Sequence, residues 1–134
     1  MVIETNFIED IRAKFAAELQ QLGYSLPSAT GDAYNDAHRV CLDHWNAFAR
    51  RIQARQRKVH RSSELRLREH LLHEPLRTGL LVVEQELIGG QDLTPRLSRK
   101  LKDRTFNDKM LHDWGLHHLH LGTATENDGF VKRC

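Results

Sequence analysis

Apolar residues near the start of the chain repeat with the period of an α-helix, and this repeat constrains the fold more than any other feature. The residues at four-residue steps are Phe7, Ile11, Phe15 and Leu19. On a helix of 3.6 residues per turn they form one stripe. Asn6 and Glu9 have the spacing of a capping box, and Gly23 can take the left-handed conformation that ends a helix. We therefore expect a helix over about residues 6–22.

A second helical stripe follows a connector that Pro27 and Gly31 interrupt. This stripe runs from about Asp32 to about Lys58. Its apolar residues are Tyr34, Ala37, Cys41, Trp45, Phe48 and Ile52. At 1.5 Å per residue such a helix would be roughly 40 Å long, which exceeds the width of a compact domain of this size. We therefore expect the helix either to break near Gln53 or to project and pack against another surface, such as a second copy of the chain.

Capping and breaking residues divide the next part of the chain into shorter helices. Ser62 or Ser63 can cap a helix over residues 62–74, and Pro75 fits the first turn of the next helix, over residues 75–90. The run LLVV inside that helix is also compatible with a buried strand, but the length of the segment and the EQEL that follows favour a helix. Two further short helices are expected, over residues 92–103 and 105–115.

The period changes at residues 116–121, LHHLHL, where leucine and histidine nearly alternate between two glycines. Alternation predicts a strand, and after a turn-rich stretch residues 130–134 would begin a return strand. The expected fold is therefore mainly α: a single-domain helical bundle over residues 1–134 with a short C-terminal β-hairpin or strand at about 116–134. The unfinished hairpin would leave unpaired backbone groups, which a partner chain can complete.

Composition and charge exclude several classes of protein. Of the 134 residues, 40% are hydrophobic and 28% are charged, so a core can form without metal or disulfide support. The formal charge of +2 is too small to indicate a nucleic-acid partner by itself. Cys41 is expected to be a small buried hydrophobe and Cys134 a free thiol. We expect no cofactor, no secretion signal, no membrane partner and a cytoplasmic location.

The segment WGLHHLHLG places three histidines within four positions. In a strand, His118 and His120 would share one face and could present two imidazoles to a metal ion, or act as general acid and base on a phosphate ester. His112 or Asp113, from the end of the preceding helix, could supply a third ligand if the chain folds back, and His112 is also a candidate catalytic group. No second Cys/His pair stands at metal-ligand spacing, so structural histidines are favoured over a metal or catalytic site.

The sequence from His44 to Ser63 contains no acidic residue. Its cations are Arg50, Arg51, Arg55, Arg57, Lys58 and Arg61. The candidates for nucleic-acid binding are Arg50, Arg51, Arg55 and Lys58, because a basic helical stripe can neutralise several phosphates. The nearby aromatic residues lie on the apolar stripe instead, so a base-stacking platform is missing. A solvated helix end, whose cations suit the negative pole of the helix dipole, is the favoured interpretation.

Residues 106–133, FNDKMLHDWGLHHLHLGTATENDGFVKR, resemble a group of uncharacterised small bacterial proteins carried on mobile elements, including integron gene cassettes. Members of that group continue with more strands, so the resemblance implies a sheet that this chain leaves unfinished at Cys134. The resemblance implies an origin and no assigned activity.

These observations identify no biochemical activity and leave open whether the chain is an enzyme. The function they favour is that of a helical interaction or structural protein acting as a homodimer, in which a strand or helix can be exchanged between copies. Two alternatives stay open. One is a nucleic-acid-associated protein that uses the basic segment 50–61. The other is a histidine-based, metal-dependent or nuclease-like hydrolase that uses His118 and His120.

Overall fold

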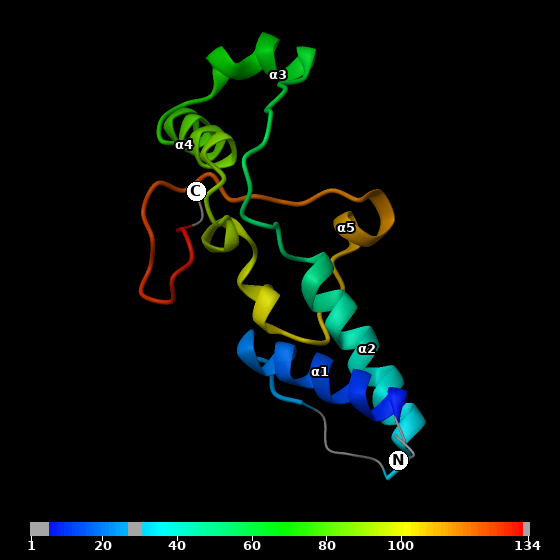
Figure 1. The fold of residues 1–134 in the computed structure, drawn as a ribbon. Helices are drawn as coiled ribbons and strands as arrows, with labels where there is room; N and C mark the ends of the chain where they lie inside the picture. Colours follow the sequence, from blue (N-terminus) through cyan, green and yellow to red (C-terminus); the bar gives the residue numbers. More distant parts are fainter. Residues whose placement is uncertain (1–5, 27–30, 133–134) are drawn as a thin grey trace. The chain divides into compact units, whose positions relative to one another are not determined.

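The computed structural model describes residues 6–26 and 31–132, and this part of the chain is mainly helical (Figure 1). The α-helices are α1 (Phe7–Gln21), α2 (Ala33–Ala49), α3 (Ser63–Arg68), α4 (Leu76–Gly89) and α5 (Lys109–Trp114). Short 3₁₀ turns accompany them: η1 (Glu69–Leu71), η2 (Thr94–Arg96) and η3 (Arg99–Lys102). Across the described residues, no helix combines the length and the apolar character needed to cross a bilayer. Pro27, Cys134 and the side chain of Tyr34 lie outside the described part.

The chain divides into two compact units. The first comprises the described residues of Met1–Arg50 and Lys100–Asp108, and the second those of Arg51–Arg99 and Lys109–Cys134. This division does not test the single domain expected from the sequence, which stays a prediction.

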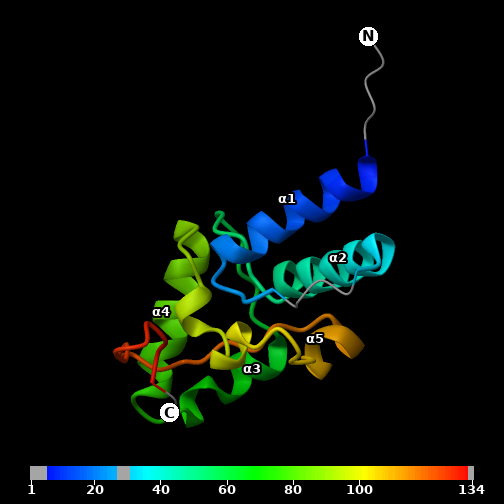
Figure 2. The same cartoon turned by 90° about the horizontal axis from the view of Figure 1, so that it is seen from below.

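The first unit is built on α1 and α2, which lie side by side (Figure 2). The buried residues at the centre of this pair are Leu19, Tyr24, Val40 and Ala47. The predicted helix over residues 6–22 is confirmed: the Asn6 side chain accepts the backbone N–H of Glu9 at 3.3 Å, and Gly23 has a φ of +83°. The Tyr24 hydroxyl donates to the carbonyl of Leu101, which attaches residues 100–108 to the helix pair.

The predicted helix over residues 32–58 is shorter than expected, because α2 ends at Ala49. The buried Arg50 guanidinium donates to four backbone carbonyls, those of Asn46, Lys100, Asp103 and Phe106. This arginine therefore binds its own helix to residues 100–108. Beyond Ile52 no large apolar residue extends the stripe until Val59, so a longer helix would have no apolar face to bury.

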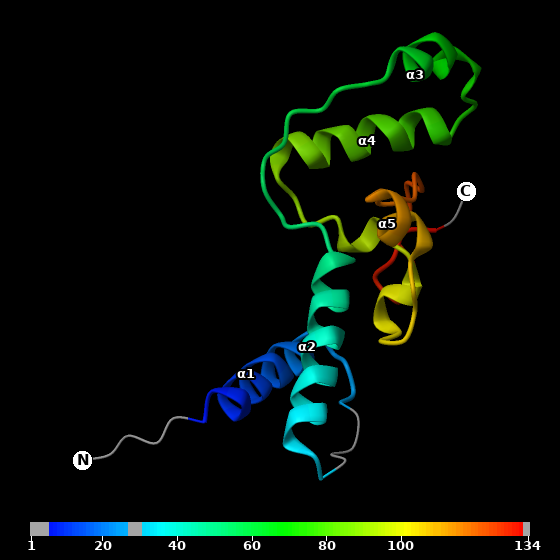
Figure 3. The same ribbon diagram turned by 90° about the vertical axis from the view of Figure 1, so that its right-hand side faces the viewer.

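The second unit contains α3 and α4, preceded by the non-helical residues 51–62 (Figure 3). The backbone N–H of Arg57 donates to the Leu87 carbonyl at 3.0 Å, so this segment is attached to the last turn of α4. Ser62 caps α3 as predicted, since its hydroxyl accepts the backbone N–H of Leu65 at 3.1 Å. The helix predicted over residues 62–74 is shorter, because η1 ends it at Leu71.

The helix α4 confirms the helical interpretation of the LLVV run. Pro75 immediately precedes its first residue, and Gly90 follows its last residue with a φ of +73°, the left-handed conformation expected of a terminating glycine. Gly79 is buried on α4 against the backbone of Leu121, and a Cβ at position 79 would overlap the Leu121 carbonyl oxygen. The absence of a side chain at Gly79 therefore lets residues 116–122 lie directly on the helix.

The C-terminal β-hairpin predicted at about 116–134 is wrong over the residues described. Residues 116–121 form no strand, and the pairing found in this region is one isolated antiparallel bridge between Thr125 and Val131. The backbone groups of the segment bind an arginine instead of a neighbouring strand: the His120 N–H donates to the Arg96 carbonyl at 2.8 Å. The predicted helices over 92–103 and 105–115 are the turns η2 and η3 and the helix α5.

Candidate functional site

An apolar groove lies on the surface of the helix pair in the first unit. Its lining residues are Phe7, Ile8 and Ile11 of α1 and Ala37, His38 and Cys41 of α2. Its volume is about 170 Å³. The groove is therefore smaller than a typical small-molecule pocket, which has a volume of roughly 300–1,000 Å³.

Beyond the groove, α2 carries exposed aromatic side chains. Trp45 and Phe48 follow Cys41 at helical spacing and are 65% and 44% exposed, and Phe7 on α1 is 72% exposed. The three charged residues of α2, by the same spacing, project from the opposite side: Asp36, Arg39 and Asp43. We call the surface formed by Phe7, Ile8, Ile11, Cys41, Trp45 and Phe48 the apolar face.

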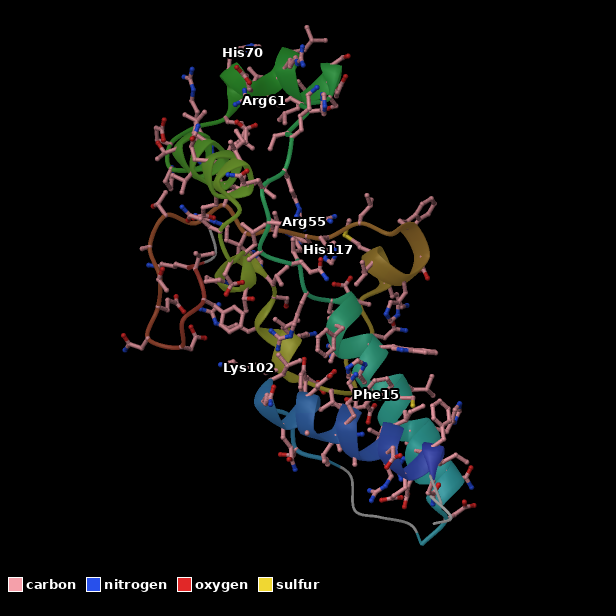
Figure 4. The ribbon with its side chains drawn as sticks, viewed as in Figure 1. Phe15, Arg55, Arg61, His70, Lys102 and His117 are labelled. Atoms are coloured by element: carbon pink, nitrogen blue, oxygen red, sulfur yellow. The ribbon has the colours of Figure 1, made fainter. Side chains whose placement is uncertain are left out.

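The buried His44 packs against Phe48, one of the residues of the apolar face. The His44 ring stacks on Phe15, which Figure 4 labels, with the ring centroids 4.0 Å apart, and it packs against Phe48 at 4.4 Å. Its Nε2 binds the Glu18 carboxylate on α1. The periodicity places His44 and Glu18 on helices but gives no sign that they pair, since the contact depends on how α1 and α2 pack. His44 thus fixes the orientation of Phe48 and joins the two helices.

The histidine segment does not converge on a catalytic constellation. The rings of His118 and His120 are neighbours, with centroids 5.1 Å apart and planes 40° apart. His112 is exposed on α5, and His117 is exposed beside the pair. Among the residues described, no group of three His, Cys, Asp or Glu side chains is placed to hold a metal ion. The structure therefore brings two of the predicted histidines together but gives them no third ligand.

A buried arginine that the sequence does not reveal holds this histidine segment in place. The Arg96 guanidinium binds both carboxylate oxygens of Glu86, and it donates to the carbonyls of His120 and Gly122 at 3.2 and 2.9 Å. The Arg96 side chain is only 5% exposed. In the sequence, Arg96 is one of several cations in a polar stretch, and nothing distinguishes it from its exposed neighbours.

The basic segment 50–61 is not a single helical face. Arg50 is buried in the first unit, whereas Arg51 is half-buried and Arg55 and Lys58 are exposed in the second unit. Arg61 pairs with Glu69 and Glu84 and is therefore neutralised (Figure 4 labels Arg55 and Arg61). The nucleic-acid hypothesis depends on a continuous basic stripe along a helix over residues 50–61. The helix α2 ends at Ala49, before this segment starts.

The Arg61–Glu84 pair predicts a pH-dependent stability of the second unit. The hydrogen bond from Arg61 lowers the pKa of Glu84, so the pair stabilises the fold above the unfolded carboxyl pKa of about 4.3 and loses its effect as the pH falls through the folded pKa. We expect Arg61→Met to lower the melting temperature at pH 7 and to differ less from the unmodified protein below about pH 4.

The matched control for this prediction is Arg68→Met, because Arg68 and its partner Glu64 are 71% and 64% exposed and such pairs contribute little. Melting curves at both pH values decide the matter. An Arg61→Met effect that is equal at pH 7 and at pH 3 would show that the variant acts through something other than the Glu84 charge.

Comparison with known proteins adds no functional assignment. No protein-family model matches the chain, and no curated protein or solved structure is similar to it. The candidate sites are therefore judged on their own geometry.

Proposed function

We propose that this protein is a helical interaction protein that acts as a homodimer, in which the apolar face of one copy packs on the apolar face of another. The observation that carries this proposal is the exposure of Trp45, Phe48 and Phe7 on the α1–α2 pair, where Phe7 lines the apolar groove and Trp45 and Phe48 follow Cys41 of the groove at helical spacing. Aromatic residues are enriched, and charged residues depleted, at the centres of protein interfaces.

The size of the apolar face fits a dimer. From their exposed fractions, its side chains present on the order of 500 Å² of apolar surface. A stable interface buries about 800 Å² on each partner, of which the outer part is a polar rim. The apolar face therefore supplies the centre of an interface of ordinary size. It is also as large as the largest apolar patches of monomeric proteins, which are often functional.

Charge favours a second copy over a foreign partner. The charged residues of α2 lie on its other side, so the α2 part of the apolar face offers no charge pattern for a complementary partner to match. A symmetric dimer needs none, because each copy presents the same patch to the other. The net charge of +2 is too small to oppose the association of two chains.

The other expectations keep their place as proposals. We propose a cytoplasmic location and a relation of residues 106–133 to mobile-element proteins. Both are compatible with this function, but neither supplies evidence for it. The nucleic-acid and hydrolase hypotheses stay predictions, since the structure gives neither a continuous basic stripe nor a third ligand group among the residues described.

Replacing Trp45 by glutamate is expected to convert the dimer to a monomer. The substitution places two charges, one from each copy, in an apolar centre, which costs several kcal/mol of association free energy. Sedimentation equilibrium measures the effect as an increase of at least about a hundredfold in the dimer dissociation constant. Trp114→Glu is the matched control, because Trp114 is a helical tryptophan that is 77% exposed and lies outside the apolar face.

The comparison of the two tryptophan variants gives each outcome a meaning. A dimer that survives Trp45→Glu, whatever the effect of Trp114→Glu, places the interface elsewhere and overturns the proposal. If the unmodified protein is a monomer, the homodimer is excluded and the apolar face needs a different partner. Far-UV circular dichroism of each variant verifies that α1 and α2 remain folded, and Phe7→Glu provides a second variant on the other helix.

A further inference from the structure

The neighbouring rings of His118 and His120 form a pair that the proposed function does not use. Their centroids are 5.1 Å apart with an interplanar angle of 40°. His118 is exposed, and His120 is half-buried. Residues 116–121 form no strand, so the proximity of the two rings comes from the local conformation of this segment and not from strand alternation.

The backbone that carries this pair is held at several points. His120 donates its N–H to the Arg96 carbonyl at 2.8 Å and accepts from the Arg96 guanidinium through its own carbonyl. The same guanidinium binds Gly122, and the segment lies on α4 where Gly79 has no side chain. Because Arg96 is itself fixed by Glu86, ring positions in this loop depend on a buried ion pair. Such support preorganises ligands and reduces the entropic cost of binding.

We propose that the imidazoles of His118 and His120 together bind one divalent transition-metal ion of the class that prefers nitrogen ligands, such as Ni²⁺, Cu²⁺ or Zn²⁺. Imidazole is a common ligand for these ions, whereas Mg²⁺ and Ca²⁺ prefer oxygen. An ion bonded to both rings at about 2.0–2.1 Å needs the two nitrogens roughly 3.4 Å apart in tetrahedral geometry. The ring centroids lie 5.1 Å apart, so the proposal requires side-chain rotations that bring one nitrogen of each ring to this separation.

The site is a two-ligand surface site. The described residues supply no third His, Cys, Asp or Glu at this position, so water completes the coordination shell. An ion held in this way exchanges readily and retains open positions. The site binds a metal ion and does not depend on the apolar face, which belongs to the other unit.

Titration of the full chain with Ni²⁺ tests the proposal. Isothermal titration calorimetry should show one saturable site, and the paramagnetic ion should broaden the ring signals of His118 and His120 before those of the other histidines. His118→Ala and His120→Ala should each weaken binding by at least about tenfold, because each removes one of two imidazole ligands. His117→Ala, which removes the adjacent exposed ring, should leave the affinity unchanged.

Each of the alternative results would overturn the proposal. These are the absence of saturable binding, broadening that begins at another histidine, or unchanged affinity in the His118→Ala/His120→Ala double variant. If the double variant unfolds, the order of broadening in the unmodified protein still decides the question. The failure of this site would leave the sedimentation results for Trp45→Glu unaffected, so the two proposals are tested separately.

Discussion

Replacing Gly79 by alanine is expected to destabilise the second unit strongly. A Cβ at this position would overlap the Leu121 carbonyl oxygen and press on the Cβ of Leu121. These atoms belong to a backbone held by Arg96, so they cannot move aside as the end of a flexible side chain can. The cost of such overpacking is on the order of 3 kcal/mol or more.

Gly89→Ala is the matched control on the same helix. The nearest atoms to a Cβ at Gly89 belong to the Gln91 side chain at 3.8 Å, an ordinary contact distance. Alanine favours the helix over glycine by about 1 kcal/mol, so this variant should be neutral or slightly more stable. Urea unfolding followed by circular dichroism measures both variants. Equal stability of Gly79→Ala and Gly89→Ala would mean that residues 116–122 do not lie on α4 as described.

Replacing Arg96 by methionine is expected to release the histidine segment. The change leaves the Glu86 carboxylate without its partner and removes the donors to the His120 and Gly122 carbonyls. Breaking one side of a buried ion pair costs about 3–5 kcal/mol, because the remaining charge has lost its compensation. We expect the loss to appear as faster amide exchange over residues 116–122, together with a lower unfolding free energy.

A double-mutant cycle separates the charge from the carbonyl bonds. In Arg96→Met/Glu86→Leu the uncompensated carboxylate is gone, so part of the lost stability should return. The part that does not return reports the two carbonyls that lose their donor. If Arg96→Met alone changes neither stability nor exchange, the buried pair does not hold the segment.

Helices governed by local signals could be predicted from the sequence. The stripe from Phe7 to Leu19 and the caps at Asn6 and Ser62 define α1 and the start of α3, because these contacts lie within a few residues of one another. Gly90 ends α4 for the same reason. In each case the stabilising contact is made within the element itself.

Features that depend on distant contacts could not be predicted in this way. Arg50 and Arg96 read as ordinary surface cations, yet each is buried against carbonyls more than 20 residues away. Arg96 is also the reason that the alternating segment LHHLHL does not need a strand partner. A pattern of side chains cannot show which group will satisfy the backbone.

The candidate interface was predicted in part. The sequence places Cys41, Trp45 and Phe48 on one apolar stripe, and periodicity alone does not distinguish a core from an interface. In the structure the contact with α1 is made by a neighbouring strip of α2, with Ala37, Val40 and Ala47 buried. Small side chains allow two helices to approach closely, so the larger aromatic residues remain at the side of the contact. That offset is what exposes the apolar face.

The central claim is that the apolar faces of two copies meet, and isotope-filtered nuclear Overhauser measurements on a mixture of labelled and unlabelled protein test it most directly. We expect contacts between copies in which Trp45 and Phe48 of one copy meet the apolar face of the other. The contacted residues there would be Phe7, Ile11, Trp45 or Phe48. Contacts between copies confined to other surfaces, such as the exposed Leu67 of α3 and Leu71 of η1, or no contacts between copies at all, would contradict this proposal.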